Sequence, residues 1–318
     1  MRNGIAILNA RAGTLLDGSE GEPGRVIGEA FAAIGYQVEV VLAEPAKLEK
    51  AIVAAARSTH DLVFVGGGDG TLNLAVAHLA GSGKTLGVLP LGTMNLLARA
   101  LGGPMPIVEA ISAFEGAEAV RIDLAYLNGR PFHTISGLGF FTQMARAREQ
   151  MRGFPLGRWI GFAVSLARAF LRTGRHRLSV EIDGARRPIH AYAILVTNNA
   201  FGPPTWQRDR LDGGMLELHI GHDVSFWHRV NAGVDVLTGK WRDNATIETA
   251  TARSVTIRSR RSKMWVTLDG ELTREATPLR YEIRPGALSV LQPRQAAPGE
   301  PLPAAPLPTE EAATPRNP

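Results

Sequence analysis

The sequence predicts an α/β domain with a parallel sheet, followed by a β-rich domain. Short apolar runs alternate with helical patterns over residues 1–124, whereas runs that alternate apolar with polar residues dominate residues 125–292. Hydrophobic residues make up 45% of the 318 residues, which suffices for a core in each domain. After residue 292 the composition changes again, since eight of the 20 prolines lie in residues 293–318.

The first domain contains four apolar runs of strand length, at residues 5–8, 38–42, 61–65 and 86–89. Between them lie stretches with apolar side chains at helical spacing, at residues 26–34, 48–56 and 72–79. The runs are nearly continuous in Val, Ile and Leu, as in strands that are covered on both faces. This alternation favours a parallel sheet, in which ligands bind at the carboxyl ends of the strands.

The second domain opens with helical patterns at residues 141–151 and 156–173. Strand patterns then follow at residues 178–182, 190–197, 215–220, 254–257, 265–268 and 279–283. Their alternation is typical of an antiparallel sheet with one exposed face. Residues 293–318 have almost no large apolar side chains, so we expect a disordered tail there.

The composition excludes several classes of protein. No cysteine is present, which rules out disulfides, zinc ribbons and cysteine nucleophiles. The apolar run near the amino end, residues 5–8, is too short for a secretion signal, and the longest one, residues 159–167, is too short to span a membrane. We therefore expect a cytoplasmic protein.

The formal net charge is +5, and 30 of the 35 basic residues are arginines. Ten arginines lie between Arg146 and Arg187, where only three acidic residues oppose them. This concentration forms either a solvated face or a surface for phosphate groups of nucleic acid or anionic lipid. Basic residues do not alternate with aromatic ones there, so we expect no nucleic-acid partner.

A glycine-rich run follows the third predicted strand and leads into the next predicted helix: Gly66, Gly67, Gly68, Asp69, Gly70 and Thr71. Glycines at a strand end let backbone N–H groups approach an anion, and the helix amino terminus adds partial positive charge. Asp69 would repel bare phosphate, so it indicates Mg²⁺. The run predicts a polyphosphate site rather than a plain turn.

A second loop, with Gly92, Thr93 and Asn95, follows the next predicted strand. Neighbouring strand ends in a parallel sheet lie about 5 Å apart, so both loops can line one nucleotide. Gly83-Lys84-Thr85 only looks like a P-loop, because the required glycine at 78 is His78 and the segment precedes a strand.

The two loops together resemble the catalytic domain of the diacylglycerol kinase family, in particular the bacterial lipid kinases related to sphingosine kinases. The resemblance spans about residues 3–292 and includes Asn9 to Gly13, Gly137 to Phe140, Leu211-Asp212-Gly213 and Asp269-Gly270-Glu271. It implies an α/β nucleotide-binding domain and a β-sandwich domain, whose last strand can return to the first domain. It also implies ATP and Mg²⁺ as cofactors.

The resemblance implies roles for individual residues. Asp269 would be the general base, Glu271 would join the metal–water network, and Asp69 is associated with ATP and Mg²⁺. Asp123 matches a further acidic member of that network, and Asp212 matches a ligand of a structural Mg²⁺. Nucleotide contacts fall on Asn9, Thr71, Thr93 and Asn95. The sequence departs from the family at Ala10, where proline is usual, and at Pro203 and Pro204, which replace small residues.

The function expected from these motifs is transfer of the ATP γ-phosphate to a hydroxyl of diacylglycerol or a related lipid, with the protein in peripheral contact with a membrane. Residues 154–171 form either an interfacial helix or a buried one. The histidines show no metal-ligand pattern. Phosphorylation of a soluble acceptor, as by NAD kinases, and a non-catalytic nucleotide- or lipid-binding role are the alternatives. A homodimer is left open.

Overall fold

The computed structural model describes residues 2–12, 23–93, 95–150, 173–202, 208, 210–222, 225–238 and 240–294. Most of the predicted helix over 156–173, the prolines at 203 and 204, and the expected tail beyond residue 294 lie outside this part. Contacts divide the chain into two compact units. Unit 1 comprises the described residues of Met1–Gly68, Lys84–Ala119 and Leu291–Pro318, and unit 2 those of Asp69–Gly83 and Val120–Val290.

Unit 1 is an α/β domain. Its elements are β1 (Arg2–Asn9), α2 (Pro23–Ala33), β2 (Tyr36–Ala43), α3 (Pro45–Ala56), β3 (Leu62–Gly67), β4 (Thr85–Pro90), α5 (Leu96–Ala100) and α6 (Ile107–Ser112). The strands lie in the order β4-β3-β1-β2, and all three pairings are parallel. The parallel sheet predicted from the alternating apolar runs is therefore confirmed.

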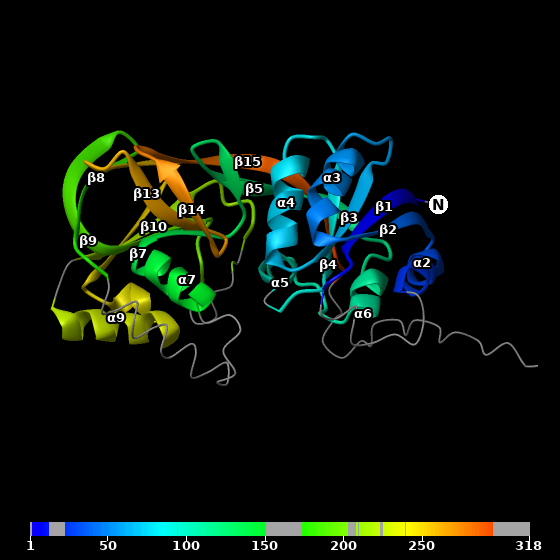
Figure 1. Ribbon diagram of the computed structural model, residues 1–318, viewed down its shortest axis with the longest axis horizontal. Coiled ribbons are helices and arrows are strands. Elements are labelled where there is room, and N and C mark those ends of the chain that lie inside the picture. Colours follow the sequence, from blue (N-terminus) through cyan, green and yellow to red (C-terminus); the bar gives the residue numbers. More distant parts are fainter. Residues whose placement is uncertain are drawn as a thin grey trace, which may run out of the picture. The chain divides into compact units, whose positions relative to one another are not determined.

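Large side chains fill the core of unit 1 beside the central strand β3. Phe31, Tyr36 and Phe114 surround the fully buried Phe64 ring. Gly87 on β4 makes room for this ring, since a Cβ there would lie 2.2 Å from it. Helix α2 lies beside β2, as Figure 1 shows.

Unit 2 contains helix α4 and most of the chain from residue 120 onward. Its elements are α4 (Asp69–Leu79), β5 (Glu118–Leu127), β6 (Arg130–Phe132), β7 (Ile135–Gly139), α7 (Phe140–Gln150), β8 (His176–Ile182), β9 (Ala185–Asn198), β10 (Leu216–His222), α9 (Phe226–Thr238), η1 (Trp241–Asp243), β11 (Ile247–Ala252), β12 (Ser254–Arg258), β13 (Lys263–Leu268), β14 (Glu271–Ala276) and β15 (Leu279–Gln292).

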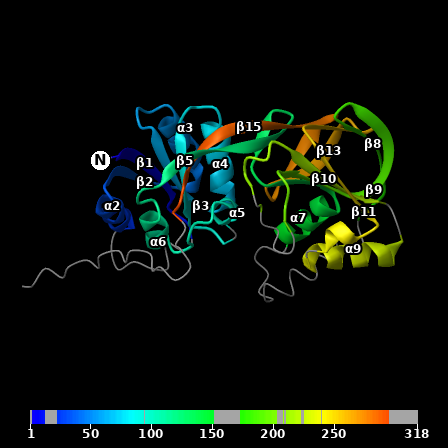
Figure 2. The ribbon, with the colours of Figure 1, turned by 180° about the vertical axis from the view of Figure 1, so that it is seen from behind.

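The strands of unit 2 form a β-sandwich-like domain, as expected. They follow the order β14-β13-β7-β9-β8-β12-β15, with β10 paired to β9 and β11, and β5 paired to β15 and β6. Figure 2 shows the strong curvature of β8 and β9. Their inward-facing residues belong to one apolar core, which includes Val180, Val196, Ile257 and Tyr281. Helix α7 lies against β7, β9 and β13.

Candidate functional site

Gly68 and Gly92, one from each glycine-bearing loop, lie together in unit 1. Strands β3 and β4 run in parallel with Gly67 opposite Pro90, so the loops leave the sheet at the same edge. A Cβ on Gly92 would lie 2.4 Å from the Cα of Gly68, closer than real Cβ atoms come to backbone. Only glycine at position 92 permits this approach, which brings the two loop backbones into contact.

The polar residues of these loops differ in how accessible they are to a ligand. Asn95, in the left-handed conformation with φ 49°, closes the second loop on itself: Gly92 N donates to its Oδ1 at 2.9 Å, and its Nδ2 donates to the Gly92 carbonyl at 2.8 Å. Asn95 is buried, whereas Thr93 is exposed. At the end of β1, Asn9 accepts a hydrogen bond from Arg11 N. Asn95 is therefore used for loop structure, and Thr93 is accessible to a ligand.

Asp269 and Gly270 form the two-residue turn between β13 and β14. Both have positive φ, 46° and 87°, and Leu268 pairs with Glu271, as in a type I′ hairpin. This turn directs the Asp269 carboxylate into the protein, where its side chain is only 3% exposed. The carboxylate accepts backbone N–H groups from His133 at 2.9 Å, Thr134 at 2.8 Å and Ile135 at 3.0 Å.

The side chain of Asn73 on α4 is the fourth donor to Asp269. With its amide nitrogen turned inward, which satisfies its hydrogen bonds, the nitrogen lies 3.2 Å from Asp269 Oδ2 and 2.9 Å from His133 Nε2. The same nitrogen lies 3.3 Å from the carbonyl oxygen of Asp69. Asn73 therefore links the start of α4 to Asp269.

The Asn73 contact also fixes the tautomer of His133, which is fully buried. Because Nε2 accepts from Asn73, the ring proton resides on Nδ1, 2.7 Å from Thr134 Oγ1. Burial lowers the pKa of this imidazole below its usual value, while the neighbouring Asp269 carboxylate opposes the decrease. His133 is thus a neutral hydrogen-bonding partner in the folded protein.

A buried cation completes this group. Arg208 Nη1 donates to the His133 carbonyl, and the residue is 8% exposed. Burial lowers the pKa of Arg208 to about 10, and the nearby Asp269 opposes part of that decrease. Nη2 of Arg208 is buried and has no hydrogen-bond partner within the described part of the chain. Its positive charge balances the buried Asp269 carboxylate.

The other predicted acidic residues have distinct surroundings. Glu271 is exposed beside the amino end of α4, since a Cβ on Gly70 would lie 2.9 Å from its Oε1. Asp123 is buried, and its carboxylate accepts Gly214 N at 2.6 Å and Gly286 N at 2.9 Å. Asp212 is exposed and forms two hydrogen bonds with Arg210, which lower its pKa.

Helix α4 therefore brings Asp69 at its first turn into one group with Asp269 and Glu271. Asn198 connects Asp123 to this group, because its Nδ2 donates to the carbonyl groups of both Asp123 and His133. Asp212 forms its ion pair with Arg210 instead. No three described Asp, Glu or His side chains form a metal site by themselves.

Comparison with known proteins identifies the family. Residues 3–127 match the diacylglycerol kinase catalytic domain, and residues 139–292 match the YegS C-terminal NAD kinase beta sandwich-like domain. The chain belongs to the diacylglycerol kinase catalytic-domain family. Membership places it among lipid kinases, whose reaction requires a nucleotide donor.

Individual relatives agree with this assignment. A diacylglycerol kinase of Bacillus subtilis is 29% identical over 223 residues, covering 68% of this chain and 73% of the relative. One from Staphylococcus saprophyticus is 33% identical over 116 residues, covering 35% and 37%. A Bacillus anthracis structure described as a diacylglycerol kinase has the same fold, with a TM-score of 0.67, 20% identity and coverage of 92% and 96%.

Sequence reasoning missed Asn73, His133 and Arg208 in this member of the diacylglycerol kinase family. Asn73 lies four residues after Asp69, and this helical spacing is the signal that could have drawn attention to it. His133 and Arg208 carry no local pattern. None of the helices in the described residues is both long and apolar enough to cross a membrane.

The buried His133 predicts a pH dependence of stability. An unfolded histidine takes up a proton below about pH 6.5, whereas the lowered pKa keeps the folded one neutral. The unfolded state then binds more protons, so the free energy of unfolding should fall as the pH drops from about 7.5 to 5.5. Urea unfolding at both pH values measures this slope.

In the same measurement, His133→Gln should flatten the slope, although His176, whose pKa is also lowered by burial, should preserve part of it. The exposed His190 serves as the control, and His190→Gln should leave the slope unchanged. An unaltered slope in His133→Gln would contradict the assignment.

Proposed function

We propose that the protein transfers the γ-phosphate of ATP to a hydroxyl group of diacylglycerol or a related lipid. The observation that supports this most is the grouping of Asp69, Asp269 and Glu271 at the amino end of α4. This helix begins one residue after Gly68, whose backbone contacts that of Gly92. Family membership supports the lipid kinase reaction.

The contacting loops suit the triphosphate of ATP. Gly68 and Gly92 have no side chains to block an approaching phosphate, and backbone N–H groups at such turns bind phosphate oxygens. Thr93 is exposed and can donate its hydroxyl. Nucleotide binding would therefore depend mainly on the loop backbone, and its affinity on the close contact between the loops.

The acidic residues suit Mg²⁺, which takes oxygen ligands and often uses one or two carboxylates together with substrate phosphates. Asp69 and Glu271 are the carboxylates at the amino end of α4 that would hold it. Mg²⁺ would neutralise charge on the phosphates during transfer.

Asp269 would accept a hydrogen bond from the lipid hydroxyl and orient it. In the transfer, the hydroxyl oxygen bonds to the γ-phosphorus, the bond from that phosphorus to the β–γ bridging oxygen breaks, and ADP leaves. The hydroxyl proton passes to Asp269. A carboxylate is a weak base toward an alcohol, so the proton moves late and the orienting hydrogen bond contributes most.

Radiolabelled ATP tests this proposal on the full chain with Mg²⁺ and a panel of lipids. The expected result is label in an organic extract, with kcat reduced at least about 100-fold in Asp69→Ala. Asp61→Ala, which removes an exposed aspartate on unit 1, should retain wild-type kcat.

Three other results would overturn parts of the proposal. Label in a water-soluble product would indicate a soluble acceptor, such as NAD. No transfer to any acceptor despite nucleotide binding would indicate a non-catalytic binding protein. Wild-type kcat in Asp69→Ala would remove Asp69 from the site.

A further inference from the structure

The chain's net positive charge comes from one unit. Residues 69–83 and 120–290, which make up unit 2, contain 25 Lys and Arg against 16 Asp and Glu, whereas the rest of the chain contains 10 against 14. The net charges are therefore +9 and −4. Nothing in the phosphoryl-transfer site requires this asymmetry, because the buried acidic and basic groups around Asp269 account for few of these residues.

Strand pairing collects part of this charge on one solvent-facing side of unit 2. The register places Arg186 of β9 opposite Glu181 of β8, which is opposite Thr256 of β12, which is opposite Arg280 of β15. The residues of this row therefore share one face of four neighbouring strands, and the alternate residues on the same strands, such as Val180 and Ile257, are buried in the core.

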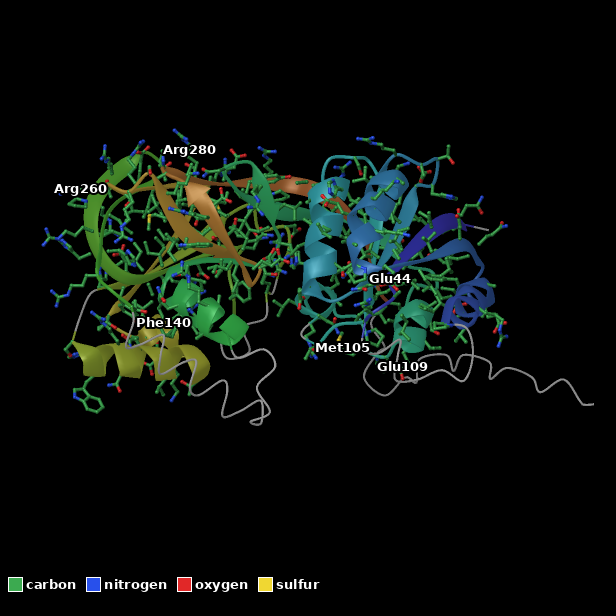
Figure 3. All side chains as sticks on the ribbon, in the orientation of Figure 1. Glu44, Met105, Glu109, Phe140, Arg260 and Arg280 are labelled. Carbon is green, nitrogen blue, oxygen red and sulfur yellow. The ribbon has the colours of Figure 1, made fainter. Side chains whose placement is uncertain are left out.

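We name this side of the sheet the arginine face. Its basic members are Arg177 on β8, Arg186 on β9, Arg258 on β12, and Arg280 and Arg284 on β15. Arg260 and Arg261 follow β12 directly and are exposed. Figure 3 labels Arg260 and Arg280 at the outer surface of unit 2.

Few carboxylates neutralise the arginine face. Glu181 pairs with Arg258 at 3.4 Å, and Glu282 pairs with Arg284. The structure gives no acidic partner, among the described residues, to Arg177, Arg260 or Arg280. Arg186 donates to the Ser179 hydroxyl at 2.8 Å instead of to a carboxylate. The face therefore carries an excess of positive charge in contact with solvent.

The chemistry of the face favours a lipid surface over a nucleic acid. The aromatic ring beneath Arg284, that of Tyr126, is only 7% exposed and is covered by the guanidinium, so the described residues of the face offer no open ring for base stacking. Guanidinium groups spread over four strands match phosphate and carboxylate groups spread over a plane, and each basic residue near such a surface strengthens binding. A substrate that resides in a bilayer requires the enzyme to dock there.

We propose that the arginine face docks the protein onto membranes that contain anionic lipids. The biological purpose of this docking rests on the proposed lipid kinase activity. The observations on the arginine face do not depend on that activity. Binding should be electrostatic, so it should weaken as the salt concentration rises.

Co-sedimentation with vesicles tests the docking surface. Wild-type protein should bind phosphatidylserine-rich vesicles and not pure phosphatidylcholine vesicles. The variant Arg177→Glu/Arg280→Glu should bind the anionic vesicles at least about tenfold more weakly. The matched control is Lys47→Glu/Lys50→Glu on α3, which changes the net charge equally at exposed positions and should stay within about twofold of wild type.

Other outcomes would overturn this inference. Equal weakening in both variants would show that net charge, not this face, determines binding. A loss of duplex DNA binding with intact vesicle binding would assign the face to nucleic acid. Kinase activity toward lipid in neutral detergent micelles separates the two proposals, since Arg177→Glu/Arg280→Glu should keep it even if docking fails, and its absence in wild type would count against the proposed function alone.

Discussion

Asp269→Ala is expected to abolish phosphoryl transfer and to lower the free energy of unfolding by about 3 kcal/mol or more. The large stability effect follows because three backbone N–H groups would lose their acceptor: those of His133 and Thr134, which are buried, and that of Ile135, which is partly buried. Each unsatisfied donor costs about 1–3 kcal/mol. Denaturant unfolding and kcat measured under conditions where the variant is folded check the two parts.

The chain contains a matched control for this variant. Asp183 also has positive φ beside a glycine in a two-residue turn, and its carboxylate accepts Arg253 N and Ser254 N. It lies on an exposed turn. Asp183→Ala should therefore lower stability by about 1–2 kcal/mol and leave kcat intact. Asp269→Ala with kcat within tenfold of wild type would contradict the role of Asp269.

Gly92→Ala is expected to raise the KM for ATP at least about tenfold and to destabilise the protein by about 1–3 kcal/mol. The added Cβ would lie 2.4 Å from the Cα of Gly68, and neither backbone can rotate away as a side chain would. The two loops must then separate, which spoils the arrangement of N–H groups for phosphate. Nucleotide titration and denaturant unfolding measure both effects.

Gly28 provides the control for this substitution. It lies within helix α2, and a Cβ there would make only an ordinary contact of 3.9 Å with Val40. Gly28→Ala should stabilise the protein by up to about 1 kcal/mol, because alanine loses less backbone entropy in a helix. An unchanged KM for ATP in Gly92→Ala would mean that the nucleotide does not bind at these loops.

The parallel sheet of unit 1 was predictable because buried parallel strands leave a strong local signal. Runs such as residues 61–65 are almost wholly apolar, and each is followed by a helix with clear spacing. The loops between them carry glycines whose positions after strands are also local information. Fold class and the glycine-bearing loops therefore follow from short stretches of sequence.

Several elements of unit 2 were not predicted, because their own sequence patterns are weak and they are defined by the elements that they pair with. Strands β11 and β14 contain few large apolar residues and are defined by pairing with β10 and β13. Helix α9 contains Gly233 in its interior, which weakens its helical pattern. Asp269 and His133 are separated by 136 residues, so their contact exists only after folding.

The crowded surroundings of Asp269 have a consequence for the order of events. A carboxylate has about four lone-pair sites, and three backbone N–H groups and the Asn73 amide fill them. An incoming hydroxyl must displace one donor. The backbone donors are held between β6 and β7, whereas Asn73 needs only to rotate its side chain. The acceptor would then bind as this amide leaves Asp269. The same rotation would change the amide contacts with His133 and with the Asp69 carbonyl in the first turn of α4.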